Sequence, residues 1–281
     1  MAETASPPDL PPLREVIATH RLGARKALGQ NFLLDRNLID RIARAAGPLA
    51  GHWVIEVGPA PGGLTRALLA AGAERLIAIE RDRRCVAALA GLLAAYPDRL
   101  RLIAADALAV DVATLGSPPR KLVANLPYNV ATPLLLRWLT EAEAFVSLTL
   151  MFQKEVAQRL VAMPGDPAYG RLSIIVQWRA KAQRLFDVPA RAFVPAPKVT
   201  STLVQIDPRA EPLAPAPRAA LERVTRAAFG QRRKMLRSSL KTLGLDPGPL
   251  LDAAGIAPTA RAETVDIAGF CALARAYAAA K

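Results

Sequence analysis

The chain has 281 residues, of which 52% are hydrophobic, and it carries a formal net charge of +13. This length allows one large and one small domain with cores of their own, which excludes a peptide-sized binder. The excess of Lys and Arg favours a polyanionic partner, either nucleic acid or an acidic membrane face.

Cysteine and histidine are scarce, and no targeting segment is visible. Cys85 and Cys271 are far apart in apolar, helix-like runs, so we expect no disulfide framework and a reducing compartment. His20 and His52 have too few partners for a metal site, so we expect no metal. The acidic, proline-rich start and the lack of a long apolar run predict a cytoplasmic protein without a membrane segment.

The N-terminal part reads as an arm and then a helix. Residues 1–22 are predicted to form a flexible arm, because prolines interrupt regular structure there. Residues 25–35 follow; they begin with the basic pair Arg25 and Lys26 and are a candidate lid. Asp35 is the expected N-cap of a helix whose apolar face includes Ile39 and Ile42 and which closes at Gly47.

From residue 53 onward strand and helix patterns alternate, which is typical of a parallel sheet. Strands are predicted at 53–57, 75–79, 100–104, 122–124, 145–151 and 172–178, with a last one ending at 206. Helices are predicted at 82–95, from 132 onward, and at 153–161. After a proline-rich linker at 208–217 the pattern is helical, at 218–228, 231–243, 249–254 and 267–280.

The first strand leads into a glycine-bearing turn of the kind that lets a backbone approach a ligand. Glu80 lies 22 residues after Gly58, near the spacing of the acidic residue that holds ribose hydroxyls. Ala60 interrupts the G-x-G-x-x-G pattern, which favours a nucleoside cofactor over a dinucleotide. Asp106, just past another strand, has two readings: an acceptor for an adenine amino group, or a turn cap.

Asn125, Leu126, Pro127 and Tyr128 follow a strand end. The Asn125 oxygen and the Leu126 carbonyl would accept both hydrogens of an exocyclic amine, and the Tyr128 ring would lie against the heterocycle. A strand followed by a proline turn is the alternative. Phe193 is a candidate second wall of a base sandwich, with a place in the core as its alternative.

These motifs together resemble the S-adenosylmethionine-dependent adenine-N6 methyltransferases. More narrowly, the chain is similar to the bacterial small-subunit rRNA adenine dimethyltransferases, whose loss gives kasugamycin resistance. The likeness rests on five segments in the family's order: 29–33 (GQNFL), 125–129 (NLPYN), 169–173 (YGRLS), 193–199 (FVPAPKV) and 231–234 (QRRK).

The resemblance implies an α/β fold with a seven-stranded, Rossmann-like methyltransferase domain at 23–207 and a small all-helical RNA-binding domain at 208–281. The implied reaction is dimethylation of two adjacent adenines in the 3′-terminal hairpin of small-subunit rRNA, in the 30S subunit or its precursor, by a monomer. The implied cofactor residues are Gln30, Asn31, Leu33, Gly58, Glu80, Asp106 and Asn125. The implied catalytic residues are Asn125, Leu126, Pro127, Tyr128 and Phe193. The expected RNA contacts are Arg25, Lys26, Lys198, Arg232, Arg233, Lys234 and Arg237.

Three alternatives stay open. A large-subunit rRNA methyltransferase of the macrolide-resistance type shares the Asn-Pro loop. A DNA adenine methyltransferase is disfavoured, because such enzymes usually carry Asp-Pro-Pro-Tyr and a base-reading domain. A non-catalytic assembly factor stays open because Ala60 replaces the family's usual glycine, and a methyl group at positive φ would cost about 1–2 kcal/mol.

Overall fold

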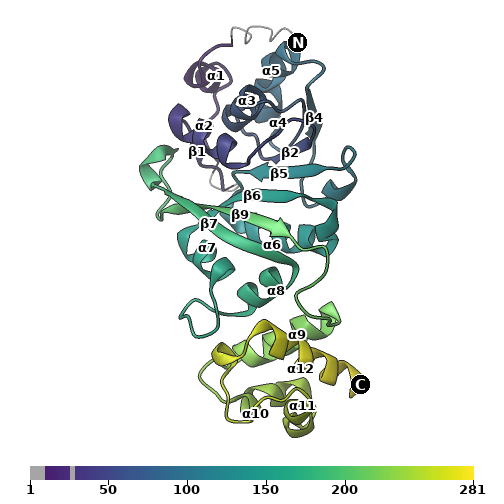
Figure 1. The fold of residues 1–281 in the computed structure, drawn as a ribbon. Helices are drawn as coiled ribbons and strands as arrows, with labels where there is room; N and C mark the ends of the chain where they lie inside the picture. The colour runs from purple at the N-terminus through teal and green to yellow at the C-terminus, as the bar shows by residue number, and fades with distance from the viewer. Residues whose placement is uncertain (1–9, 26–28) are drawn as a thin grey trace. The chain divides into compact units, whose positions relative to one another are not determined.

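The computed structural model describes residues 10–25 and 29–281 (Figure 1). The chain forms two compact units. The first comprises the chain up to Lys154 together with Arg184–Asp207, and the second comprises Glu155–Gln183 and Pro208–Lys281. The predicted boundary after residue 207 coincides with one junction between the units, whereas residues 155–183, expected in the methyltransferase domain, fall in the second unit.

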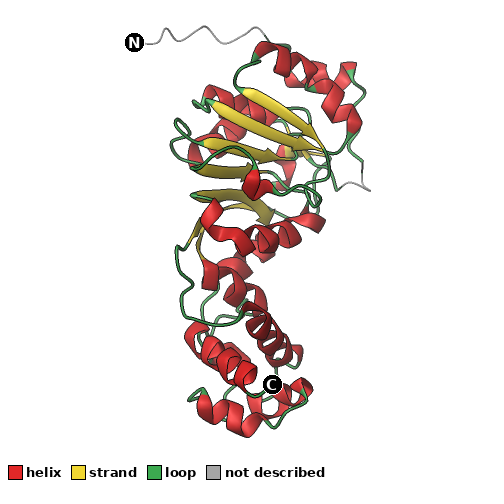
Figure 2. Ribbon diagram, turned by 90° about the vertical axis from the view of Figure 1, so that its right-hand side faces the viewer, coloured by secondary structure: helices red, strands yellow, loops and turns green. Residues whose placement is uncertain are grey.

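Among the described residues, seven strands form one sheet in the order β4-β3-β2-β5-β6-β9-β7. Figure 2 shows the strands in yellow and the helices in red. The strands are β2 (Trp53–Val57), β3 (Arg75–Glu80), β4 (Leu100–Ala104), β5 (Arg120–Ala124), β6 (Ser147–Gln153), β7 (Ala180–Val188) and β9 (Ser201–Pro208). The first five are parallel, and β9 is antiparallel to β6. Every residue of β5 is buried, as its consecutive apolar residues predict. The predicted Rossmann-like sheet is confirmed.

Helices cover this sheet, and a two-stranded ribbon pairs distant segments of the first unit. The helices are α1 (Leu13–Thr19), α2 (Arg36–Ala45), α3 (Gly63–Ala70), α4 (Arg83–Ala88), α5 (Ala90–Ala95) and α6 (Tyr128–Trp138), with 3-10 turns η2 (Val112–Thr114), η3 (Leu139–Ala144) and η4 (Ala190–Ala192). The ribbon pairs β1 (Phe32–Leu33) with β8 (Phe193–Val194). The predicted N-cap is confirmed, since the Asp35 carboxylate accepts from the Leu38 amide at 3.1 Å.

Two predictions in this unit were wrong. Residues 1–22 were expected to lack regular structure, but they contain α1, because Pro12 serves as its N-cap rather than as a breaker. Helix α6 begins at Tyr128, four residues before the predicted start at Thr132. Pro127 caps it, and Pro133 is accommodated inside the helix.

The predicted strand at 172–178 is instead helix α8 (Arg171–Arg179). Gly170 starts it, and its amide donates to the Ser173 hydroxyl at 3.1 Å in a capping contact. Ile174, Ile175 and Val176 are consecutive, β-branched and buried, a pattern that predicts a buried strand as readily as a buried helix. The strand of this region is β7, which the sequence analysis missed because polar residues interrupt its apolar ones.

The second unit is helical. Besides α8 it contains α7 (Lys154–Val161, beyond its first residue), α9 (Arg218–Gly230), α10 (Leu236–Ser239), α11 (Pro247–Ala253) and α12 (Ile267–Ala279), with η5 (Leu240–Leu243) and η6 (Ala262–Thr264). Tyr169 is fully buried, edge-on to Phe229, and its hydroxyl donates to the Val265 carbonyl at 3.0 Å. The predicted helix at 231–243 was wrong in its first five residues, which form a turn and an isolated bridge before α10.

None of the described helices is both long and apolar enough to cross a membrane. Within the same described ranges, no group of three or more His, Cys, Asp or Glu side chains could hold a metal ion. Cys85 and Cys271 are free, buried thiols. Burial raises the pKa of Cys85 to about 12 and that of Cys271 to about 11, so both stay protonated at neutral pH.

Candidate active site

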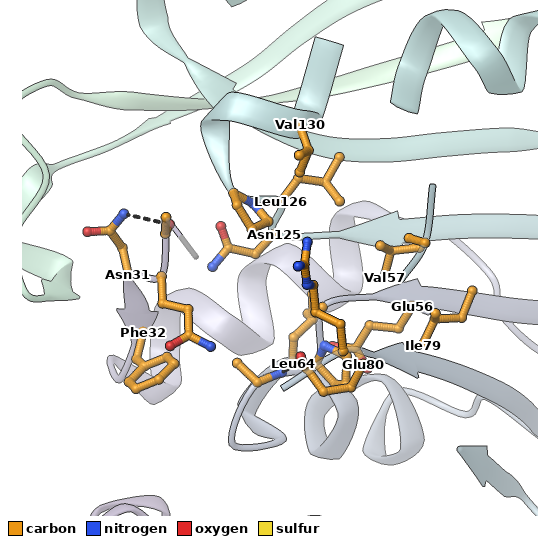
Figure 3. Close-up of a pocket in the computed structure, with 18 of the residues that line it drawn as sticks. Asn31, Phe32, Glu56, Val57, Leu64, Ile79, Glu80, Asn125, Leu126 and Val130 are labelled. Atoms are coloured by element: carbon orange, nitrogen blue, oxygen red, sulfur yellow. Dashed lines mark hydrogen bonds between the residues drawn. The ribbon is translucent and has the colours of Figure 1, made fainter. Parts of the chain in front are cut away.

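A pocket lies at the carboxyl ends of the parallel strands (Figure 3). Strand β2 has β3 on one side and β5 on the other, so the chain order reverses there, and ligands of open α/β sheets bind at such a reversal. All the predicted cofactor and catalytic residues except Phe193 line this pocket: Gln30, Asn31, Leu33, Gly58, Glu80, Asp106, Asn125, Leu126, Pro127 and Tyr128.

The loop after β5 presents unused acceptors. The Asn125 side chain is half-buried, and neither its amide nor the Leu126 carbonyl hydrogen-bonds to a residue that the structure describes. The Tyr128 hydroxyl shares a hydrogen bond of 2.5 Å with the Ser201 hydroxyl on β9, which fixes the ring at the pocket wall. Burial raises the pKa of Tyr128, so it remains a neutral aromatic surface. The loop can therefore accept two N–H donors beside a flat ring.

The turn after β2 holds a residue in an unusual conformation. Gly58 and Gly62 have φ of 73° and 90°, and between them Ala60 has φ of 51°. This left-handed conformation aims the Ala60 amide at the Glu80 carboxylate, at 3.1 Å. A non-glycine residue in this conformation is destabilised by about 1–2 kcal/mol relative to glycine. The methyl group, however, packs against the buried cluster of Val16, Leu22, Phe32, Cys85 and Ala88.

Glu80 is 5% exposed at the end of β3. One oxygen accepts from the Ala60 amide and the other from the Asp82 amide, at 3.1 and 2.8 Å. Burial raises the pKa of Glu80, and the two amide contacts oppose that rise. An ionised carboxylate has about four acceptor positions, so about two remain for ligand hydroxyls.

The Asp106 side chain caps the turn that follows β4. One oxygen accepts from the Leu108 amide at 3.0 Å, and the other pairs with the Arg81 guanidinium at 2.9 Å. The Asp106 side chain is 39% exposed. The carboxylate is thus held at the pocket rim, where it still has free acceptor positions for an adenine amino group.

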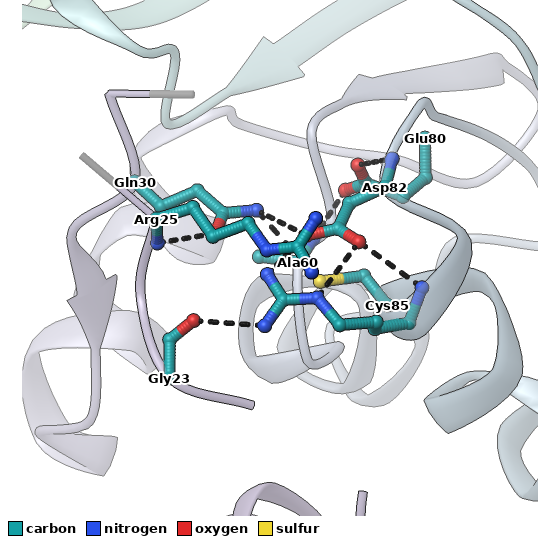
Figure 4. A network of polar contacts seen from close by, with 8 residues as sticks. Gly23, Arg25, Gln30, Ala60, Glu80, Asp82 and Cys85 are labelled. Carbon is teal, nitrogen blue, oxygen red and sulfur yellow. Dashed lines mark hydrogen bonds and ion pairs between the residues drawn. The ribbon is translucent and has the colours of Figure 1, made fainter. Parts of the chain in front are cut away.

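Residues 29–33 close one side of the pocket, and Gln30 anchors this segment in a polar network (Figure 4). The Gln30 side chain donates to Asp82 at 3.0 Å and accepts from the Arg25 amide at 3.0 Å. Arg84 pairs with the same Asp82 carboxylate at 2.6 Å and also donates to the Gly23 carbonyl at 3.1 Å. The pair with Arg84 lowers the pKa of Asp82 to about 2, so this anchor is charged at neutral pH.

Glu56 is a pocket residue that the sequence analysis missed. It lies on β2, is 1% exposed, and neither carboxyl oxygen has a hydrogen-bond partner among the described residues. Burial raises its pKa to about 8, the nearby Thr65 hydroxyl opposes that rise, and the neighbouring Glu80 carboxylate adds to it. The signal was a charged residue inside a buried parallel strand, directly before the glycine turn.

A family model described as ribosomal RNA adenine dimethylase matches residues 21–279. The chain belongs to this adenine dimethylase family. The resemblance that predicted the fold and the activity is thereby confirmed. The protein is an rRNA adenine dimethyltransferase, and it is called the dimethylase below.

Curated relatives match the sequence of the dimethylase along nearly its whole length. A protein of Rhodospirillum rubrum named ribosomal RNA small subunit methyltransferase A is 64% identical, over 96% of this chain and 94% of its own. One of the same name from Azorhizobium caulinodans is 61% identical, over 97% and 95%. A dimethyladenosine transferase from Plasmodium falciparum superposes with a TM-score of 0.73 at 25% identity, covering 84% and 94% of the two chains. The 23S rRNA methyltransferase ErmE gives 0.66 at 28% identity, covering 88% and 100%.

The methyl donor of the dimethylase is S-adenosylmethionine. The residues present fit this group. Glu80 has acceptor positions suited to ribose hydroxyls, and the partnerless Glu56 carboxyl suits a cationic end of the cofactor.

The other predicted site residues that the structure describes are not among the residues that line the pocket. Phe193 is 2% exposed, packs in the core and pairs with Leu33 on β1, so the core alternative describes its place here. Lys26 lies outside the described residues. Arg25 and Lys198 are exposed in the first unit, and the other predicted RNA contacts are in the second: Arg232, Arg233, Lys234 and Arg237.

Within that second group the side chains differ. Arg232 pairs with Glu263 at 2.9 Å and is only half-exposed. Arg233, Lys234 and Arg237 are exposed. The predicted helix at 231–243 would have placed Arg233 and Arg237, four residues apart, on one face, but α10 starts only at Leu236, so Arg233 lies outside the helix that carries Arg237.

Proposed function

We propose that this chain dimethylates the N6 amines of two adjacent adenines in the 3′-terminal hairpin of small-subunit rRNA. We propose further that it does so as a monomer in the cytoplasm, on the 30S subunit or its precursor. The names of the small-subunit relatives support the choice of rRNA. The observation that carries the chemistry is the pair of free acceptors, the Asn125 amide oxygen and the Leu126 carbonyl, beside the Tyr128 ring.

These acceptors suit an adenine amine in particular. The N6 lone pair of adenine is delocalised into the ring, and two acceptors that bind its hydrogens would draw them out of the ring plane. The lone pair then points at the methyl donor. S-adenosylmethionine, when bound, supplies an electrophilic methyl group on a sulfonium. Asn125 and Leu126 contribute mainly position, a mode in which effective molarities reach about 10⁵ M or more.

The target base must leave its stack, and Tyr128 offers it a new one. Base-aromatic stacking contributes about 1–3 kcal/mol per base. Phe193 is buried in the core and does not line the pocket, so Tyr128 is the aromatic ring available to the base. Dimethylation requires that the monomethylated amine turn and react again, so the pocket must also hold a methyl group.

The test is methyl transfer from labelled S-adenosylmethionine to small subunits that lack the modification, with the product nucleosides and their positions identified by mass spectrometry. We expect dimethyladenosine at two adjacent 3′-hairpin positions. Asn125→Ala should abolish turnover while RNA binding changes less than about threefold, because one hydrogen-bond partner of a single base is lost. Equal loss of binding and turnover would contradict the role of Asn125.

A second candidate is methylation of large-subunit rRNA. The likeness to ErmE, a 23S rRNA methyltransferase, favours it. Offering large subunits in the same assay separates the two, since transfer to 23S rRNA alone would replace the first proposal. Binding of small subunits without transfer would instead favour an assembly factor.

A further inference from the structure

A second groove lies on the other side of α2 from the pocket. Ile39 and Ile42 of this helix line the pocket, whereas Leu38 and Arg41 line the groove. Helix α1 and residues 187–194 complete the groove. Figure 1 shows α2 and β1 next to the green segment that follows β7. We propose that this arginine groove, named for Arg14, Arg41 and Arg191, binds backbone phosphates of the RNA strand that flank the target base. The inference rests on the proposed RNA substrate.

The three arginines are available to an anion. All are exposed, and none forms an ion pair with a residue in the described ranges. The Arg41 guanidinium lies over the Phe186 ring, 3.8 Å from its centroid. This stacking uses one flat face and orients the group, while the N–H edges stay free for phosphate oxygens.

The acidic residues of the groove do not cancel this charge. The Asp187 carboxylate pairs with Lys154 at 2.7 Å and with Arg184 at 3.3 Å, and it also accepts from the Thr202 hydroxyl at 2.7 Å. These contacts, led by Lys154, lower the pKa of Asp187 to about 2, and its charge is compensated. Asp35 alone opposes the three arginines, and one of its oxygens already caps α2.

The groove is next to the pocket along the chain. Phe32 and Leu33 line the pocket, and the following residues, Leu34 and Asp35, line the groove. Strand β1 pairs with β8, whose Val194 is 54% exposed and lines the groove as well. An RNA strand that places a base in the pocket can therefore continue across this ribbon into the groove.

The arrangement fits a chain of phosphates better than a small anion. A site for a single phosphate gathers its donors around one point, in the way that bidentate arginines do. Here the arginines come from three separate elements, α1, α2 and η4, and all three are exposed along an open groove. An extended polyanion can contact each of them in turn.

The test measures how RNA affinity depends on salt. The probe is a fluorescent RNA hairpin with the sequence of the small-subunit 3′ end, bound by the full chain in the presence of S-adenosylmethionine between 50 and 300 mM KCl. The slope of log K against log[salt] is negative, and each lost arginine-phosphate contact reduces its magnitude by about 0.7–1. For Arg14→Ala with Arg191→Ala we expect a magnitude smaller by about 1.5–2 and affinity reduced roughly tenfold or more at 150 mM.

The matched control is Arg83→Ala with Arg101→Ala, which removes two exposed arginines from α4 and from β4, the sheet edge opposite β7. Both double variants should bind S-adenosylmethionine like the wild type, because none of the four residues lines the pocket. Adding Arg41→Ala to the Arg14, Arg191 variant should reduce the magnitude of the salt slope by about one more.

An unchanged slope in the Arg14, Arg191 variant would overturn the inference, as would an equal loss in the control pair. If the wild type methylates its rRNA while the variant keeps its slope, the groove inference fails alone. If the wild type neither binds nor methylates the rRNA, the proposed function fails first.

Discussion

The Gln30 side chain donates to the Asp82 carboxylate at 3.0 Å, across 52 residues of sequence. The Asp82 amide in turn donates to the Glu80 carboxylate at 2.8 Å. Asp82 therefore orients both the carboxylate expected to hold the cofactor ribose and residues 29–33, which bring Asn31 and Leu33 to the pocket wall. The position of residues 29–33 is coupled to that of the nucleoside site.

Replacing Gln30 with alanine should loosen residues 29–33, while the ion pair between Asp82 and Arg84 remains. We expect KM for S-adenosylmethionine to rise about tenfold with a smaller change in kcat, because the loss weakens cofactor binding more than positioning of the amine. The free energy of unfolding should fall by about 1 kcal/mol, typical of one hydrogen bond. Initial-rate kinetics and urea unfolding measure the two effects.

Gln30→Glu sharpens this test, because it keeps the length of the side chain and places a second carboxylate beside a buried, charged one. Its effect on KM should exceed that of Gln30→Ala. If KM for S-adenosylmethionine stays at the wild-type level in both variants, the contact between Gln30 and Asp82 does not position residues 29–33.

Glu56 predicts a pH dependence of stability. Its pKa rises from 4.5 to about 8 on folding, so the folded state holds a proton that the unfolded state loses between these values. This contribution to stability is complete below about pH 4.5 and disappears as the pH rises through 8. Glu56→Gln mimics the protonated form. Urea unfolding should show the two proteins alike near pH 4.5, and the variant more stable at pH 9.

The same carboxyl predicts proton release on cofactor binding. If the cationic end of S-adenosylmethionine pairs with Glu56, binding near pH 7 should drive off its proton. Calorimetric binding enthalpies in buffers of different ionisation enthalpy count the protons released. We expect up to one for the wild type and none from this site for Glu56→Gln. Identical counts would place the cationic group elsewhere.

Ala60 is expected to be nearly neutral for stability. Its positive φ costs about 1–2 kcal/mol relative to glycine. Glycine would lose about 0.5–1 kcal/mol through the entropy of the unfolded chain and about 0.8 kcal/mol of methyl burial. Ala60→Gly should therefore change the free energy of unfolding by less than about 1 kcal/mol and the Kd for S-adenosylmethionine by less than about threefold.

Ala60→Val provides the contrast, since a β-branched residue at this φ is a true outlier. It should lower stability by about 2 kcal/mol and weaken the amide contact to Glu80. A large gain in cofactor affinity for Ala60→Gly would show instead that strain limits binding in the wild type.

Much of the fold was predictable because buried parallel strands leave consecutive apolar residues. Strands β2 to β6 were all predicted, with ends that differ by two residues at most. Helix α8 was missed because its buried centre is a run of consecutive β-branched residues, which favours a strand prediction. Helix α1 was missed because prolines were taken as breakers, although a proline also caps a helix.

The pocket was predictable because strand ends, a glycine turn and a proline loop leave local signals. Every predicted pocket residue but Phe193 lines it. The partnerless state of Glu56 was not predictable, since it depends on which groups surround the strand in space. The same is true of the arginine groove, whose members lie on three elements far apart in the sequence.

The basic cluster of the second unit should separate into a structural and an RNA-binding part. Arg232 pairs with Glu263 at 2.9 Å, and both side chains are partly exposed. Arg232→Ala should thus cost about 0.5–1 kcal/mol of stability. Arg233→Ala and Lys234→Ala, both at exposed positions, should leave stability unchanged and lower the salt slope of RNA binding by about one each. Thermal unfolding and the hairpin-binding assay measure the two effects, and a salt slope lowered only by Arg232→Ala would reverse this assignment.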